Sequence, residues 1–260
     1  MTNQQIVSSI NSYPITIILV TTKNSNPDKL LVDLIQKITN FNSPNNLNNY
    51  SDLIKLSGSI NSIKKDDVIK MKNQLNYSSI EKSNFKFFYI KKIDNSSKEV
   101  FNTLLKFIED MNSNNVGILT THDLNLIPNT VKSRCNIFFM ESDNESLKEL
   151  LQVNNLVNET WLTNLFDDLE ELELFIKSNN FISIKNLFYF FNNLNLLESK
   201  KRLEEFKLLN YLEIKILIKA LLNLHNDHLT KSLLEIYSNL KFNPIKTLIF
   251  TKLLMIMEKK

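Results

Sequence analysis

Short apolar runs alternate with longer amphipathic stretches over the first 140 residues of the chain. The runs are rich in β-branched and aromatic side chains, which is typical of strands buried on both faces. They cover residues 15–22, 52–57, 85–93, 116–122 and 136–140. Because strands alternate with helical patterns, we predict a five-stranded parallel sheet with flanking helices.

The stretches between these runs carry apolar residues at i, i+3 and i+4, which is the period of a helix. They cover residues 28–38, 66–75 and 96–111. Ser96 and Glu99 have the spacing of a capping box, which predicts the start of the third helix. Residues 39–51 are polar, contain a proline and show no period, so we predict a loop there.

The strand pattern stops after residue 140, and everything downstream has helical period. Ser142 and Glu145 form a second capping-box pattern at the start of this region. The clearest helical stretches are residues 165–178, 200–225 and 244–258. We predict three domains: an α/β domain over residues 1–140, a small helical domain over 141–180 and a larger helical domain over 181–260.

Composition narrows the possible classes of protein. The single cysteine excludes an internal disulfide and a zinc site built from several cysteines. His225 and His228 have no third ligand in view, so we expect no bound metal. The net charge of +3 allows nucleic-acid contact without requiring it. No stretch has the roughly 18 uncharged apolar residues of a membrane span, so we expect a soluble, cytoplasmic protein.

The loop after the first strand is where an α/β nucleotide-binding domain would hold phosphate. A P-loop needs two glycines, a lysine and a hydroxyl residue at fixed spacing. In the best register, residues 23–30, only Lys29 remains, and Asp28 brings negative charge to the phosphate position. Because the two glycines, Gly58 and Gly117, lie elsewhere, we predict that this site does not hydrolyse nucleotide.

Two further remnants of a nucleotide site follow later strands. Asp94 comes after the third strand, where P-loop enzymes keep a metal-binding acid, but the next residue is Asn95 instead of a catalytic glutamate. The alternative is that Asp94 only closes the strand and helps to cap the next helix. Thr121 ends the fourth strand.

Arginine is rare in this chain, which has Arg134 and Arg202 against 29 lysines (31 Lys and Arg in total, minus two). The planar arginine fork suits phosphate and carboxylate recognition better than lysine does. Arg134 stands between Ser133 and the only cysteine, Cys135, and is the leading candidate for a functional cation. The alternative is an ordinary surface arginine.

These motifs together resemble the AAA+ clamp-loader family. The resemblance covers residues 58–140. It rests on a strand ending in Asp94, the helix pattern N-T-L-L-K-F-I-E-D (102–110), the strand that ends in Thr121, and the S-R-C segment (133–135). The helical remainder is similar to the family's lid and collar by architecture alone. Within the family, loss of the P-loop with a retained S-R-C motif resembles the delta-prime subunits of bacterial DNA polymerase III.

That resemblance implies a subunit without catalysis of its own. Arg134 would enter the ATP site of a neighbouring subunit in trans, Ser133 would orient it and Cys135 would pack behind it. This chain would bind no cofactor, because ATP and magnesium would belong to the neighbour. The implied partners are gamma/tau ATPase subunits, a delta subunit, the sliding clamp and primer–template DNA. The chain departs from the family's pattern in lacking a four-cysteine zinc module near residues 39–51 and in its short collar.

Other interpretations remain open. Lys64, Lys65, Lys70 and Lys72 lie in the family element that faces DNA, but with Asp66 and a lysine-rich composition they also fit a solvated face. The chain as a whole is alternatively a gamma/tau-like NTPase with a degenerate site. A third possibility is a scaffold subunit that assembles a complex and binds no nucleotide.

Overall fold

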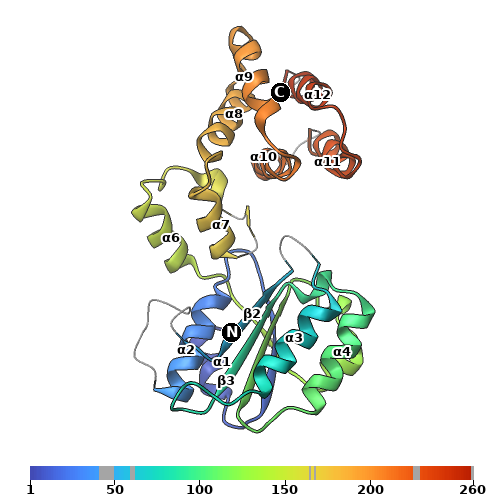
Figure 1. Ribbon diagram of the computed structural model, residues 1–260. Coiled ribbons are helices and arrows are strands. Elements are labelled where there is room, and N and C mark those ends of the chain that lie inside the picture. Colours follow the sequence, from blue (N-terminus) through green and yellow to red (C-terminus); the bar gives the residue numbers. More distant parts are fainter. Residues whose placement is uncertain (41–49, 59–61, 164, 167, 225–228, 259–260) are drawn as a thin grey trace. The chain divides into compact units, whose positions relative to one another are not determined.

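The computed structural model describes residues 1–40, 50–58, 62–163, 165–166, 168–224 and 229–258. The chain divides into two compact units, Met1–Asp143 and Asn144–Lys260. The first unit is the α/β unit and the second is the helical unit. Each is described by itself below (Figure 1).

The α/β unit is built on a five-stranded parallel sheet, as predicted (Figure 1). The strand order is β2-β3-β4-β1-β5. Hydrogen bonding between β1 and both neighbours places Ile17 beside Ile118 of β4 and Asn136 of β5. The strands are β1 (Ile15–Val20), β2 (Leu53–Ser57), β3 (Lys86–Lys91), β4 (Asn115–Thr121) and β5 (Asn136–Phe139).

Helices cover both faces of this sheet, because side chains alternate along each strand. On β1, Ile17 and Leu19 pack with α1 and α2, whereas Ile18 and Val20 pack with α3, α4 and α5. The five helices are α1 (Asn3–Ser9), α2 (Pro27–Thr39), α3 (Lys65–Asn76), α4 (Lys98–Glu109) and α5 (Asn129–Lys132). Helix α1 was not predicted, since the first ten residues hold few apolar positions beyond Ile6 and Ile10.

Both predicted capping boxes are wrong. A turn of 3₁₀ helix, η2 (Ile93–Asn95), precedes α4, and the Ser96 amide donates to its Ile93 carbonyl at 3.0 Å. Ser97, and not Ser96, is therefore the N-cap residue of α4. The Ser142 hydroxyl donates instead to the Lys23 carbonyl at 2.8 Å, and the next helix begins two residues later.

The helical unit contains α6 (Asn144–Val153), α7 (Leu169–Ile176), α8 (Phe181–Asn193), α9 (Ser199–Leu208), α10 (Tyr211–Leu224), α11 (Leu229–Asn239) and α12 (Lys246–Met257). The stretch 200–225 was predicted as one helical pattern and is two helices. Asn210 stands at the break, where its side chain accepts from the Glu213 amide at 2.9 Å and its amide donates to the Glu213 carboxylate at 2.7 Å. This reciprocal pair is a capping box that starts α10.

One hydrophobic cluster runs through the helical unit from Leu147 to Met257. Trp161 is buried and stacks on Phe188, with ring centroids 4.7 Å apart. The predicted division of this region at residues 180/181 stays a prediction, and His225 and His228 lie outside the described residues.

In the part of the chain that the structure describes, no helix is both long and apolar enough to cross a membrane. Within the same residues, no group of three or more His, Cys, Asp or Glu side chains could hold a metal ion.

Candidate functional site

The S-R-C segment lies between α5 and β5. Val131 anchors the short α5 because its side chain is completely buried against the α3–α4 side of the sheet. Ser133 is the C-cap residue, and its amide donates to the Asn129 carbonyl at 2.9 Å. The Arg134 amide then donates to Val131 at 3.0 Å, so the backbone carrying this arginine is fixed on a buried turn.

The Arg134 guanidinium contacts three residues of the part of the chain that the structure describes. Its Nη2 lies 2.6 Å from Glu109 Oε1, at the last residue of α4. Its Nη1 donates to the Thr130 carbonyl at 3.0 Å and to the Ser133 hydroxyl at 3.2 Å. The side chain is still 40% exposed, so an anion from solvent or from another protein can reach it.

The residues on either side of Arg134 differ in character. The Ser133 hydroxyl donates to the Thr130 carbonyl at 3.0 Å, which orients its oxygen to accept from Arg134. Cys135 is half-buried against the α3–α4 cluster, and burial raises the pKa of its thiol to about 12. The thiol is therefore protonated near neutral pH and is a poor nucleophile.

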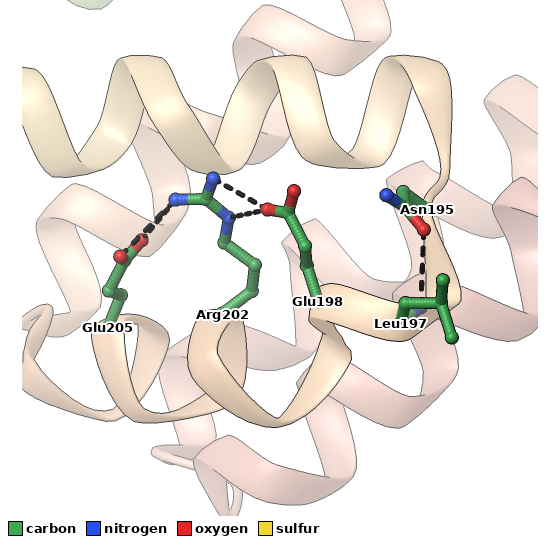
Figure 2. Close-up of polar contacts among 5 residues, drawn as sticks. All are labelled: Asn195, Leu197, Glu198, Arg202 and Glu205. Atoms are coloured by element: carbon green, nitrogen blue, oxygen red, sulfur yellow. Dashed lines mark hydrogen bonds and ion pairs between the residues drawn. The ribbon is translucent and has the colours of Figure 1, made fainter.

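The fork of Arg202, the other arginine, is bonded to two nearby glutamates, Glu198 and Glu205 (Figure 2). On α9 its fork lies between Glu198 and Glu205, with Nη2–Oε2 2.8 Å and Nη1–Oε2 2.9 Å, and the side chain is 17% exposed. Hydrogen bonding to Glu205, with a further contribution from Glu198, raises the pKa of Arg202. Two carboxylates therefore occupy Arg202, whereas Arg134 meets one.

The loop after β1, residues 21–26, is bonded to the ends of neighbouring strands. The Thr21 amide donates to the Thr121 carbonyl at 2.9 Å, and its hydroxyl lies 2.8 Å from His122 Nδ1. The Asn24 carbonyl accepts from the Asp143 amide at 2.9 Å, and Ser25 is fully buried. The Thr21 amide and the Asn24 carbonyl of this loop are thus bonded to backbone groups of the chain itself.

Asp28 and Lys91 form an ion pair at the first turn of α2. Asp28 Oδ2 lies 2.6 Å from Lys91 Nζ, and the Lys91 side chain at the end of β3 is 9% exposed. A carboxylate at a helix N-terminus satisfies the positive end of the helix dipole, which is the role of phosphate in a P-loop. Lys29 points elsewhere, with its Nζ 3.6 Å from Asp143 and the side chain 51% exposed.

The other two predicted remnants lie together at the carboxyl end of the sheet. Asp94 sits in η2 beyond β3, and its Oδ2 accepts from the His122 amide at 3.3 Å. Thr121 is buried at the end of β4, and its hydroxyl donates to the Asp123 carbonyl at 3.0 Å. The structure thus brings Asp94 next to the residue that follows Thr121, while Lys29 binds elsewhere.

Three of the four candidate DNA-contacting lysines lie on α3 and Lys64 is its N-cap residue, but the four do not share one environment. Lys64, Lys65 and Lys70 are exposed, and Lys72 is half-buried with its Nζ 3.4 Å from Asp110. Contact of these lysines with DNA stays a prediction.

Sequence reasoning missed two residues of these sites. Glu109 is one of two adjacent acids at the end of α4, and only the fold selects it as the partner of Arg134. Lys91 ends a buried strand, and a lysine there gives no sign that it reaches Asp28, 63 positions earlier (91 − 28). A charged residue inside an otherwise apolar strand is the one available signal, because such a charge needs a partner.

Comparison with known proteins places these sites in context. Residues 35–144 match a protein-family model described as DNA polymerase III, delta subunit. That match includes β2 to β5 and the S-R-C segment, and it covers less than half of the chain. No curated protein matches the chain by sequence.

One solved structure supports the fold, and two others are more distant. A DNA polymerase III gamma subunit-related protein from Thermotoga maritima is 17% identical, with a TM-score of 0.71, and the alignment covers 100% of this chain and 99% of that one. The Bacillus subtilis DNA clamp loader delta protein is 10% identical, with a TM-score of 0.36 and 99% of each chain covered. The Thermotoga maritima RuvB Holliday junction branch migration motor is 13% identical over 75% of this chain and 62% of that one, with a TM-score of 0.40.

The gamma-related structure shares the fold from end to end, and the family match lies on the segment that carries the S-R-C motif. Residues 35–144 are thus similar to a family of DNA polymerase III subunits, and the whole chain is similar in fold to a gamma subunit-related protein.

Proposed function

We propose that this chain is a delta-prime-like clamp-loader subunit that hydrolyses no nucleotide and supplies Arg134 to the ATP site of a neighbouring subunit. In this role it would act with gamma/tau ATPase subunits and a delta subunit in the cytoplasm. The complex would load the sliding clamp onto primed DNA, and ATP and magnesium would be bound by the neighbour.

One observation carries this proposal: the Asp28–Lys91 ion pair fills the corner where a P-loop holds phosphate. A phosphate entering there would meet the Asp28 carboxylate, and the loop before it offers no glycine to wrap the anion. The residues at this corner therefore do not fit a nucleotide. The same chain keeps an arginine at the end of α5 whose side chain is 40% exposed, so its fork can also meet an anion from outside.

The decisive test is ATP hydrolysis by a reconstituted complex of this chain with its partner ATPase subunits, the clamp and primed DNA. We expect Arg134→Ala to slow hydrolysis at the site it serves by about 10³-fold or more. A single-turnover burst should therefore lose one ATP per complex, while sites served by other subunits continue. Arg134→Lys should lose most of the activity too, since an ammonium lacks the planar fork.

Two outcomes would contradict the proposal. If Arg134→Ala leaves clamp- and DNA-stimulated hydrolysis unchanged, Arg134 does not act as an arginine finger. That result would favour the interpretation of the chain as a scaffold subunit. If calorimetry detects ATP binding by the isolated chain, and Lys29→Ala abolishes it, the chain is an NTPase with a degenerate site.

A further inference from the structure

We infer that Glu109 is a positioning residue for Arg134: it holds the guanidinium in place before the fork meets an anion on a neighbouring subunit. This inference rests on the proposed function, because it assigns a second residue to the same site. It starts from the 2.6 Å contact between Glu109 Oε1 and Arg134 Nη2.

The contact joins two rigid elements. Glu109 is the last residue of α4, whose Phe107 is buried against the sheet. Arg134 follows α5, which Val131 fixes on the same side of the sheet. The backbones that carry Glu109 and Arg134 are therefore both fixed by buried neighbours.

Three acceptors divide the donors of the fork. Glu109 forms an ion pair with Nη2, and Nη1 donates to the Thr130 carbonyl and the Ser133 hydroxyl. Arginine has five N–H donors, so Nε–H and one Nη2–H are left without a partner among the residues that the structure describes. Those two donors are available to an anion while the other three contacts hold the plane of the fork.

Fixing the fork in advance matters because arginine is long and flexible. A side chain that is already ordered loses less conformational freedom when it binds, and small misplacements at a reacting centre are costly. The pair is also well suited to this role because both side chains are about 40% exposed, at 40% and 42%. An exposed pair contributes little to stability, so removing Glu109 should leave the fold intact.

The contact can be tested first in the isolated chain. Its two arginines give two guanidinium signals in an NMR spectrum of ¹⁵N-arginine-labelled protein. Glu109→Ala should shift the Arg134 signal and speed its rotation, and Arg202, held by Glu198 and Glu205, should be unchanged. An unaltered Arg134 signal would overturn the inference.

The functional test uses the reconstituted complex and the single-turnover burst. Glu109→Ala should slow the phase that Arg134 serves by about tenfold to a hundredfold, with the KM for ATP unchanged. Glu109→Gln, which keeps an acceptor but no charge, should fall between. The matched control is Asp110→Asn, since this neighbouring acid lies beside Lys72 and not beside Arg134, and it should behave as wild type.

The double variant Arg134→Ala with Glu109→Ala separates positioning from a general structural effect. If Glu109 acts through Arg134, the double variant is no slower than Arg134→Ala alone. Additive losses, an unchanged rate or a faster rate in Glu109→Ala would each overturn the inference. If Arg134→Ala itself leaves the burst intact, the proposed function fails instead, and the NMR result still decides whether the contact exists.

Discussion

Glu159 carries a carboxylate inside the helical unit, where three donors surround it. Lys185 Nζ lies 2.6 Å from Oε1, and the Trp161 indole and the Tyr189 hydroxyl each donate to Oε2 at 2.7 Å. Burial acts to raise the pKa of Glu159, but the hydrogen bonds from Lys185, Tyr189 and Trp161 outweigh it and lower the pKa. The charged form is thus the form that the folded unit stabilises.

Glu159→Gln should therefore destabilise the helical unit by about 2 kcal/mol at neutral pH, since a hydrogen bond to a charged group contributes about 1.5–3 kcal/mol. A lowered folded pKa gives stability that is present above the unfolded value, about 4.3, and is lost as pH falls through the folded pKa. The difference between wild type and variant should then shrink below about pH 4. Urea unfolding followed by Trp161 fluorescence at several pH values measures it, and a difference that is constant with pH would contradict the assignment.

Sequence alone identified some of these residues for a physical reason. Arg134 was recognisable because the chain otherwise uses lysine, and a rare choice of cation is a local property of the sequence. The partners Glu109 and Lys91 were not recognisable, because each is selected by contacts between segments far apart in the chain.

At the start of α2, residues next to one another in the sequence stabilise the helix N-terminus. Asn26 caps it by accepting from the Lys29 amide at 3.1 Å, Pro27 occupies the first helical position, and Asp28 adds negative charge in the first turn. Lys91 then neutralises that charge from β3.

Replacing Asp28 by alanine should destabilise the α/β unit by about 3 kcal/mol, because Lys91 would keep a largely buried charge without this carboxylate. The double variant with Lys91→Met should recover much of the loss. Lys29→Ala is the matched control, since its exposed pair with Asp143 contributes about 0–1 kcal/mol. Chemical denaturation measures all three, and equal effects of Asp28→Ala and Lys29→Ala would show that the pair is not special.

Helices and strands were predicted correctly where the hydrophobic periodicity was strong. Their boundaries were wrong where a capping interaction sets the end of a helix. The five strands were recognised because each is a short run rich in apolar residues, and β1, β3 and β4 are buried along their whole length. The α4 start was misplaced because η2 takes up the residues before it, and the break between α9 and α10 was missed because the Asn210–Glu213 box interrupts a continuous apolar pattern.

The whole molecule contains two units with separate hydrophobic cores. The clusters of the α/β unit hold residues between Ile6 and Met140, and that of the helical unit begins at Leu147. Domains with their own cores respond independently to substitutions far from their boundary.

Hydrogen–deuterium exchange should therefore show that each substitution acts within its own unit. Asp28→Ala should speed exchange in β1 and β3 and leave exchange in α8 and α10 unchanged. Glu159→Gln should speed exchange in α8 and α10 and leave exchange in β1 and β3 unchanged. Faster exchange in both units from either substitution would indicate one cooperative unit instead of two.

Cys135 has a practical consequence for labelling. Burial raises the pKa of this thiol to about 12, so very little of it is ionised at pH 7, and thiolate is the species that maleimides modify. A cysteine introduced at an exposed position, such as Asp110 beside the Arg134 partner, would react far faster than the native thiol. The chain can thus carry a single fluorophore next to its candidate finger with the native cysteine left in place.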